Sequence, residues 1–298
     1  MNQTDFVAFR SGSVVKPSLK RLKRIETISR SVLVLPSSLK RGFQSEPHQH
    51  ERGQFLYSYC GRYGLIANKC LWSGTRQQGI WVPPHTYHQV YSNEETLVYS
   101  AYVNVNQLPD MPKTCTVVDV PPLLRELIAY CEKFPRADDK LESYRRRTLR
   151  VLADQIRLGS SCDHVYLPIS RHPRIQKIME ALIENPGDHR SFEDWVAESN
   201  LSARSLSRLF QSEAGMSFGN WRRNLRVIEA ISKLDAGESV LSVALDMGYT
   251  SQSAFTAMFR RVSGDLPSRF SRRSSSYASD VVANRMPCGD SAAVSIQS

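Results

Sequence analysis

The pattern of apolar and polar positions changes in character along the chain. From about Ser31 to Val105, short β-prone runs alternate with Gly, Pro and Asn, whereas the residues after Pro121-Pro122 show helical spacing. Short strands separated by such turns predict a small barrel or jelly roll. The predicted strands are Val32–Leu35, Gly53–Tyr59, Gly64–Leu71, Gly79–Val82, His88–Tyr91 and Leu97–Val105. The predicted fold class is therefore α+β and multidomain, with an N-terminal β-barrel, a helical pair and an all-α C-terminal domain.

Two amphipathic helices are predicted after the barrel. The first has Leu123, Leu124, Leu127, Ile128 and Cys131 at helical spacing. The second, Lys140–Leu158, has Leu141, Tyr144, Thr148, Val151, Leu152 and Gln155 at such intervals. An antiparallel pair with an exposed apolar stripe suits a dimer interface, and packing of both helices on their own barrel suits the pattern equally well. Arg145–Arg147 is interpreted as a solvated charged face.

The region Ser191–Arg273 repeats one pattern at an interval of 49 residues. Leu206, Phe210, Gly215 and Phe218 recur as Phe255, Phe259, Gly264 and Pro267. A small residue on an apolar helix precedes each set, Ala197 in one copy and Ala244 in the other. Two helices that cross closely at such a residue and a tight turn form a helix-turn-helix, whose second helix is free to enter the major groove of DNA.

Local signals set the limits of the predicted helices. In the first unit, Ser191–Asp194 is a capping box that opens the helix Phe192–Ser199, and Ser202 caps the helix Ala203–Ala214 after an Asn200-Leu201 turn. In the second unit, Val240, Val243 and Ala244 lie on the first helix, Gly248-Tyr249-Thr250 forms the turn, and Ser251–Val262 is the recognition helix. An amphipathic helix over Ser217–Leu234 joins the two units, and Pro173 begins the first helix of the domain.

These motifs resemble the DNA-binding domain of the AraC/XylS family of bacterial transcription regulators. The resemblance covers His172 to Arg273 and rests on segments 202–210, 215–218, 244–255 and 259–267. It implies a double helix-turn-helix domain that reads two successive major grooves, roughly 34 Å apart. Ala257 stands where many relatives carry a polar side chain, so we expect the second unit to read bases weakly and mainly to bind phosphate.

The DNA contacts are expected from polar side chains turned away from the apolar faces. Arginine can bond guanine edges with two donors, and helix starts lie close to the phosphate backbone. We expect base contacts from Arg204, Ser207, Arg208, Gln252, Ser253 and Thr256. We expect phosphate contacts from Arg222, Arg223, Arg260 and Arg261, with Ser202, Ala203 and Ser251 at the helix starts.

The barrel region resembles the two-part signature of cupins, in which two His, a Glu and a later His converge on a divalent metal. Here His48, His50 and His88 match the histidines, and Gln54 stands at the Glu position. Three imidazoles suit zinc, nickel or iron even without the anionic ligand. The other interpretations are a ligand pocket or structural histidines without metal, and a metal-dependent reaction. His85 occupies a position where glycine is usual. The aromatic residues Trp72, Trp81, Tyr57, Tyr59, Tyr87 and Tyr91 either line an effector pocket or form core.

Charge and composition refine this division. The net charge is +10, but segment 172–273 holds 14 basic against 12 acidic residues and contributes only +2. The expected domains are a basic flexible leader (1–30), a cupin-like sensor barrel (31–120), the helical pair (121–160), a linker (161–171), the DNA-binding domain (172–273) and a disordered tail (274–298). The six cysteines show no paired spacing, and no membrane span or signal segment is evident, which favours the cytoplasm.

The domain order matches AraC-type regulators with a cupin sensor. The expected protein is a sequence-specific transcription regulator, and not an enzyme, with promoter DNA, RNA polymerase, an unknown small-molecule effector and a second copy of itself as partners. No cofactor is expected beyond a possible divalent metal in the barrel. Two alternatives are a metal-dependent cupin enzyme with a helical DNA-binding appendage, against which Gln54 argues, and an architectural DNA-binding protein, against which the low charge of the domain argues.

Overall fold

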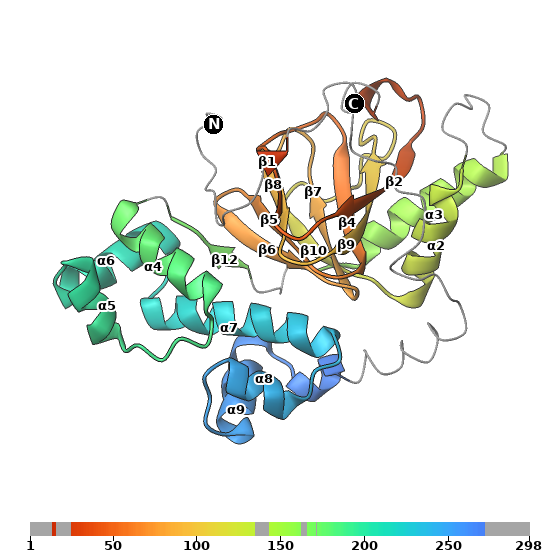
Figure 1. Cartoon of the computed structure of the whole chain (residues 1–298). Coiled ribbons are helices and arrows are strands. Elements are labelled where there is room, and N and C mark those ends of the chain that lie inside the picture. Colours follow the sequence, from red (N-terminus) through yellow and green to blue (C-terminus); the bar gives the residue numbers. More distant parts are fainter. Residues whose placement is uncertain (1–13, 16–24, 135–142, 162–165, 171, 272–298) are drawn as a thin grey trace. The chain divides into compact units, whose positions relative to one another are not determined.

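A computed structural model describes residues 14–15, 25–134, 143–161, 166–170 and 172–271 (Figure 1). The chain divides into two compact units, which are described separately. Unit 1 contains residues 1–68, 72–164 and 286–298, and unit 2 contains residues 69–71 and 165–285. Among the described residues, no helix combines the length and apolar character needed to cross a membrane.

Unit 1 is built on two six-stranded sheets, ordered β1-β3-β8-β5-β6-β12 and β11-β10-β7-β4-β9-β2. The longest pairings are antiparallel, between β2 and β9 and between β4 and β9. The strands are β1 (Val14–Val15), β2 (Val32–Leu39), β3 (Phe43–Ser45), β4 (Gly53–Cys60), β5 (Tyr63–Ala67), β6 (Cys70–Gly74), β7 (Gln78–Val82), β8 (His88–Ser92), β9 (Thr96–Val103), β10 (Thr116–Asp119), β11 (Ser160–Ser161) and β12 (Leu167–Pro168). This two-sheet β domain agrees with the predicted barrel or jelly roll.

The predicted single strand Gly64–Leu71 is wrong, because the chain reverses within it. Asn68 and Lys69 have φ of 52° and 60°, the left-handed backbone of a two-residue hairpin turn between β5 and β6. An Asn-Lys pair is a weaker hairpin signal than Asn-Gly, so the turn was not evident from the sequence. The strands β3 and β10 were also not predicted.

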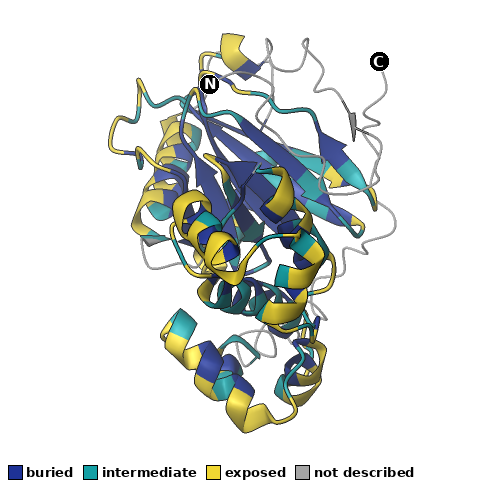
Figure 2. Cartoon of the chain, turned by 90° about the vertical axis from the view of Figure 1, so that its left-hand side faces the viewer, coloured by how far each residue is buried: buried dark blue, intermediate teal, exposed yellow. Residues whose placement is uncertain are grey.

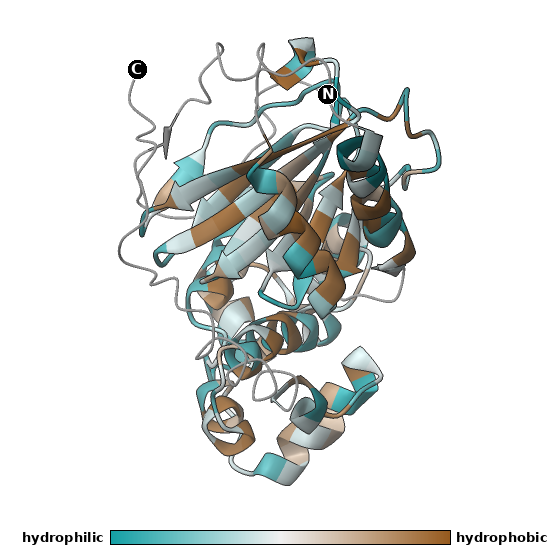
Figure 3. Ribbon diagram, turned by 90° about the vertical axis from the view of Figure 1, so that its right-hand side faces the viewer, coloured by the Kyte–Doolittle hydropathy of each residue, from teal (hydrophilic) through white to brown (hydrophobic). Residues whose placement is uncertain are grey.

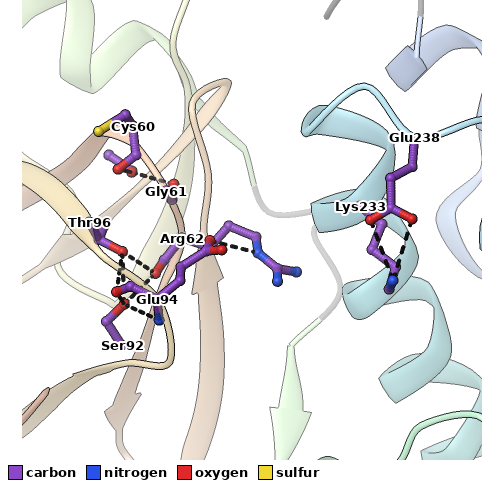
Figure 4. A network of polar contacts seen from close by, with 9 residues as sticks. Cys60, Gly61, Arg62, Ser92, Glu94, Thr96, Lys233 and Glu238 are labelled. Carbon is purple, nitrogen blue, oxygen red and sulfur yellow. Dashed lines mark hydrogen bonds and ion pairs between the residues drawn. The ribbon is translucent and has the colours of Figure 1, made fainter. Parts of the chain in front are cut away.

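A hydroxyl network fixes the turn between β8 and β9 (Figure 4). Ser92 Oγ and Thr96 Oγ1 lie 2.8 Å apart, and both are hydrogen-bonded to the Arg62 carbonyl at 2.9 Å. Gly61 has φ of 73°, and a Cβ added there would lie 2.5 Å from the Glu95 carbonyl oxygen. This position therefore requires glycine, both for its backbone conformation and for the close approach of the next turn.

The helices α2 (Pro122–Glu132) and α3 (Ser143–Leu158) pack against their own β domain. Their buried side chains share one core with strand residues such as Phe55 and Trp81. These buried side chains are Leu124, Ile128, Cys131, Leu149, Leu152, Ala153 and Ile156. The second alternative from the sequence is therefore confirmed. Figure 2 shows the mixture of buried and exposed positions on the helices of the chain.

The predicted stripe of α3 is not the stripe that packs. Tyr144 and Val151 are exposed, at 40% and 43%, whereas Leu149 and Ile156 are buried. Leu152 is the predicted member that lies in the core, and Leu141 falls outside the described residues. The helix carries apolar residues on two faces, and spacing alone could not show which one the β domain covers (Figure 3).

The β domain begins before Ser31, where the leader was predicted to end. Ile25 is buried with Leu33, Leu35 and Tyr102, and the short strand β1 pairs with β3. The last residues of the predicted leader therefore belong to the domain. Residues 1–13 and 16–24, the tail 274–298 and residues 162–165 and 171 of the linker lie outside the described residues.

Unit 2 contains helices on both sides of a long central helix, α7. The helices are α4 (Pro173–Glu184), α5 (Phe192–Ser199), α6 (Ala203–Ala214), α7 (Phe218–Asp235), α8 (Val240–Asp246) and α9 (Gln252–Ser263). Phe210 of α6 contacts Trp221 of α7, with ring centroids 6.1 Å apart. Farther along α7, Val227, Ala230 and Leu234 pack with α8 and α9. One helix thus contributes to the cores of both halves, as predicted.

Serine caps and glycine ends fix the helix limits. Ser191 and Asp194 form the predicted capping box, and Ser202 accepts a bond from the backbone of Ser205. Gly215 and Gly264 end α6 and α9 with φ of 69° and 78°. The predicted first residues of α7 and α9, Ser217 and Ser251, are in fact their N-caps, and α9 continues to Ser263 rather than ending at Val262.

Candidate functional site

The first helix-turn-helix consists of α5, a turn at Asn200 and α6. Asn200 has φ of 53°, a left-handed conformation that asparagine tolerates better than most residues. Leu206 and Phe210 are fully buried, while Leu209 is half-buried. The predicted contacts on the opposite face, Arg204, Ser207 and Arg208, are exposed, together with Ser202, Ala203 and Gln211. The helix therefore offers arginine and serine side chains to a partner.

One detail of this unit differs from the prediction. Ala197 was expected at the crossing of the two helices, but it is exposed. Trp195 is the buried residue of α5, and it lies 49 positions before the buried Ala244 of α8. The repeat should therefore have been aligned on Trp195, a residue too large to match the small-residue pattern.

The second helix-turn-helix consists of α8, a turn at Gly248 and α9. Phe255, Met258 and Phe259 face the core as predicted. Of the predicted base contacts, Gln252 and Ser253 are exposed and Thr256 is half-buried. Ser251 and Ala257 are exposed as well.

The two candidate recognition helices α6 and α9 are the basic parts of this domain. They carry Arg204, Arg208, Arg260 and Arg261 against one acidic residue, Glu213. Within the described part of the chain, these four guanidinium groups have no hydrogen-bond or ion-pair partner, and all four residues are exposed. Unneutralised arginines on exposed helices suit phosphate and guanine recognition.

Arg222 and Arg223 on α7 differ from each other. Arg223 is half-buried and donates a hydrogen bond to the Asn220 side chain. The guanidinium of Arg222 instead donates to the backbone carbonyls of Arg190, at 2.7 Å, and Asp188. Burial, followed by the nearby Arg226, lowers the pKa of Arg222. Arg222 thus holds a loop of its own domain, in place of the free side chain that a phosphate contact was expected to use.

Arg226 of α7 lies at a junction that the sequence did not reveal. Its Nε donates to the Pro186 carbonyl and its Nη2 to the Asp188 carbonyl, each at 3.0 Å. Its guanidinium also lies 5.3 Å from the ring centroid of Tyr249. The loop before α5 is thereby tied to the turn before α9, so the junction links the two helix-turn-helix units.

Tight backbone packing completes the junction. Gly248 has φ of 78°, and a Cβ added there would lie 2.6 Å from the Gly187 carbonyl oxygen. Arg190 closes the other side of the loop with ion pairs to Asp188, at 2.8 Å, and Glu198, at 2.6 Å. Its guanidinium lies 3.6 Å from the centroid of the Trp195 ring. The loop 186–190 is therefore held by arginines from two directions.

In unit 1, the structure brings together all four predicted residues of the histidine site. The ring nitrogens available from His48, His50 and His88 lie within 4.8 Å of one another. Gln54 Oε1 lies 2.9 Å from His50 Nε2 and 3.0 Å from His88 Nε2. His48 pairs with His88 through backbone hydrogen bonds in an isolated bridge, so two β segments position the three rings. The predicted convergence is confirmed.

Hydrogen bonds determine which nitrogen of each ring is free. The Nδ1 atoms of His48, His50 and His88 face the carbonyls of Glu46, Arg52 and Thr86, at 2.9, 2.5 and 2.9 Å. A carbonyl can only accept, so each Nδ1 carries the proton and a neutral ring keeps its Nε2 lone pair. Three Nε2 lone pairs thus lie in one small space.

Burial keeps these imidazoles neutral. It is the largest influence on each ring, and it lowers the pKa of His48 to about 4 and that of His50 below the usual value. The pKa of His88 is lowered well below its usual value by burial and then by His48 and His50. Neutral rings are the form that binds metals.

The surroundings of the cluster answer two questions raised by the sequence. His85 has φ of 56°, and its backbone N donates to the His50 carbonyl at 2.9 Å. The turn that normally uses glycine therefore forms with histidine. Trp81 and Tyr57 lie in the core shared with α2 and α3, so these two residues are core rather than the lining of an effector pocket.

Comparison with known proteins places this architecture. A helix-turn-helix domain family matches residues 195–273. The HTH-type transcriptional regulator NimR of Escherichia coli is 31% identical over 231 residues, which cover 77% of this chain and 83% of NimR. The chain belongs to the AraC/XylS family of transcription regulators.

Two further comparisons cover less of the sequence or show lower similarity. RipA of Corynebacterium glutamicum, also an HTH-type transcriptional regulator, is 35% identical over 103 residues, which cover 35% of this chain and 31% of RipA. The crystal structure of ToxT from Vibrio cholerae matches 82% of this chain and 98% of that chain, with 15% identity and a TM-score of 0.33.

Family membership decides between the alternatives left open by the sequence. The protein is a DNA-binding transcription regulator and not an enzyme, because its relatives are transcription regulators. The individual base and phosphate contacts stay predictions. Arg190 and Arg226 were missed because their partners are backbone carbonyls and distant acids, which leave no motif in the sequence.

Proposed function

We propose that the β domain senses a small-molecule effector and that its histidine cluster holds a divalent transition metal as part of that site. The observation that supports this proposal is the chemistry of the donor set. Three neutral imidazoles present Nε2 lone pairs, and Gln54 presents Oε1 to two of them. Lone pairs that face one another repel unless a cation lies among them.

The orientation of Gln54 supports the same conclusion. Its Nε2 donates to Ser100 Oγ at 3.0 Å and lies 3.2 Å from the Tyr102 hydroxyl. This arrangement leaves Oε1 directed at His50 and His88. His48, His50, His88 and Gln54 would hold a zinc, nickel or iron ion through three nitrogens and one oxygen. When bound, the metal would supply a Lewis-acidic position for a donor atom of the effector.

The opposite orientation of the Gln54 amide gives a competing account without metal. The amide Nε2 would then donate to both rings, and Oε1 would accept from Ser100 and Tyr102. Metal analysis of the purified protein, followed by zinc titration by calorimetry, separates the two arrangements. We expect one equivalent of metal per chain, lost in His50→Ala and bound more tightly in Gln54→Glu, which adds an anionic ligand.

The matched control is His85→Asn, since His85 is exposed and asparagine also tolerates the left-handed backbone. It should bind zinc like the unchanged protein. Absence of stoichiometric binding in the unchanged protein, or equal binding in His50→Ala, would refute the metal proposal and leave the cluster as a hydrogen-bonded network.

We further propose that the regulator acts in the cytoplasm as a homodimer on promoter DNA and alters the recruitment of RNA polymerase. Exposed apolar side chains on α2 and α3 support self-association, since such residues suit an interface. They are Leu123 at 55%, Tyr130 at 50%, Val151 at 43% and Leu158 at 66% exposure. Val151→Glu should shift sedimentation equilibrium towards monomer, and Arg157→Glu, an exposed change on the same helix, should not.

Sequence-specific reading of DNA has its own test. The purified protein is incubated with sheared DNA of its host at near-physiological salt, and the retained fragments are sequenced. Fragments sharing two short blocks about one helical turn apart are expected. Even retention of all fragments, lost as salt rises, would contradict specific recognition by α6 and α9.

A further inference from the structure

A second candidate binding site lies in unit 1, on α3 and the segment that leads into β2. It is a cavity of about 510 Å³. Arg146, Arg147 and Arg150 of α3 line one side, and Ser29, Arg30 and Ser31 line another. The cavity shares no residue with the histidine cluster. It also gives a structural context to the arginine run that the sequence suggested was only a solvated face.

The charges around this cavity are not balanced. Its lining includes four arginines and no acidic residue. Within the described residues, the guanidinium groups of Arg146, Arg147 and Arg150 have no hydrogen-bond or ion-pair partner. Arg157, farther along the same helix, is by contrast paired with Asp154 at 3.7 Å.

Helical spacing makes this arrangement unfavourable by itself. Arg150 is three and four residues from Arg147 and Arg146, so the three side chains are neighbours on one helix surface. Like charges at this spacing repel, and the other face of α3 is fixed by Leu149, Leu152 and the rest of its buried stripe. A bound anion would neutralise the repulsion. Guanidinium groups match the planar oxygens of carboxylates and phosphates, and serine hydroxyls can add further donors.

We propose that this cavity binds a small anionic molecule through a carboxylate or phosphate group. Arg146, Arg147 and Arg150 donate to the oxyanion, and Ser29 and Ser31 close the site from the β-domain side. The ligand thereby connects the first turns of α3 to the start of β2. The proposal goes beyond the metal site, and its test is independent of the histidine cluster.

The test is calorimetric titration of the full-length protein with inorganic phosphate and, separately, with succinate, at constant ionic strength set by sodium chloride. Saturable binding of at least one probe is expected. Binding of phosphate alone identifies a phosphorylated ligand class, and binding of succinate alone identifies a carboxylate class. In Arg146→Ala and Arg150→Ala, the dissociation constant should rise about tenfold or more, because each variant loses charge-assisted bonds.

The matched control is Arg157→Ala, which removes the same charge from α3 outside the cavity. Its dissociation constant should stay within about twofold of the unchanged protein, since an exposed charge at that distance is screened. All three arginines are exposed, so the variants should fold, and thermal melting without ligand checks this. No saturable binding of either probe, no effect of Arg146→Ala and Arg150→Ala, or an equal effect of Arg157→Ala would overturn the proposal.

Discussion

Replacing Arg226 with alanine tests how the two helix-turn-helix units are held together. The change removes two hydrogen bonds of 3.0 Å, to the carbonyls of Pro186 and Asp188, and the stacking on Tyr249. Alanine keeps the helical propensity of α7, so the loss can be assigned to these contacts.

The magnitude follows from the partners that remain. A hydrogen bond from a charged donor contributes about 1.5–3 kcal/mol, and a cation–π contact at a partly exposed site about 0.5–1 kcal/mol. The Asp188 carbonyl keeps its bond from Arg222, whereas the Pro186 carbonyl loses the donor described here. Because the two bonds come from one side chain, they are not fully additive. We therefore expect a loss of about 2–3 kcal/mol in the free energy of unfolding of unit 2.

Hydrogen exchange of peptides from residues 172–271 measures this loss without assuming that the whole chain unfolds in one step. The largest gain in exchange is expected around the loop 186–190 and the turn at Gly248. Binding to DNA with both sequence blocks should weaken more than binding to DNA with one block, since only the former needs both units in register. Arg269→Ala, which removes an exposed arginine paired with Asp265 in the same unit, is the control and should leave exchange unchanged. Unaltered exchange in Arg226→Ala, or the same change in both variants, would refute the role of the junction.

Three other substitutions test the remaining parts of unit 2. Phe210→Ala empties a fully buried site and should cost about 3–5 kcal/mol, measured by thermal melting, with loss of DNA binding. Arg208→Ala should weaken DNA binding by about 1–3 kcal/mol and relax specificity at one base pair in selection experiments, while an equal loss on all sequences would assign it to phosphate. Gly264→Ala, with φ of 78° and open space around it, should cost about 1–2 kcal/mol, and Gly248→Ala should cost more in the same melts because its Cβ would meet Gly187. Equal costs at the two glycines would contradict the tight packing of the junction.

The helical domain was largely predictable because its signals are local. Ser191 and Asp194 are three residues apart and define where α5 begins, and Gly215 and Gly264 end α6 and α9 through their own backbone conformation. Each of these signals acts within one helical turn, so its physical cause is contained in a short stretch of sequence. The convergence of the histidines was also predictable, because a known two-part pattern relates His48 and His50 to His88.

The errors occur where the cause lies elsewhere in the fold. The face of α3 that packs depends on the β domain that covers it, and periodicity cannot distinguish Leu149 from Val151 as the buried side. The bonds of Arg222 and Arg226 go to carbonyls 32 to 40 residues away. A carbonyl is present in every residue, so nothing in the sequence marks these acceptors. The cavity on α3 was missed for the same reason, since its second wall comes from a distant segment.

The low net charge of the DNA-binding domain follows from this internal pairing. Of its acidic residues, Asp188 and Glu198 pair with Arg190, and Glu238 and Asp246 pair with Lys233 (Figure 4 shows the Lys233–Glu238 pair). These carboxylates neutralise cations that hold the domain together, and they leave the arginines of α6 and α9 without partners. The +2 total therefore underestimates the charge that DNA would meet at the recognition helices. Binding through these helices predicts a salt dependence set by the few arginines that reach phosphate, rather than by the net charge of the domain.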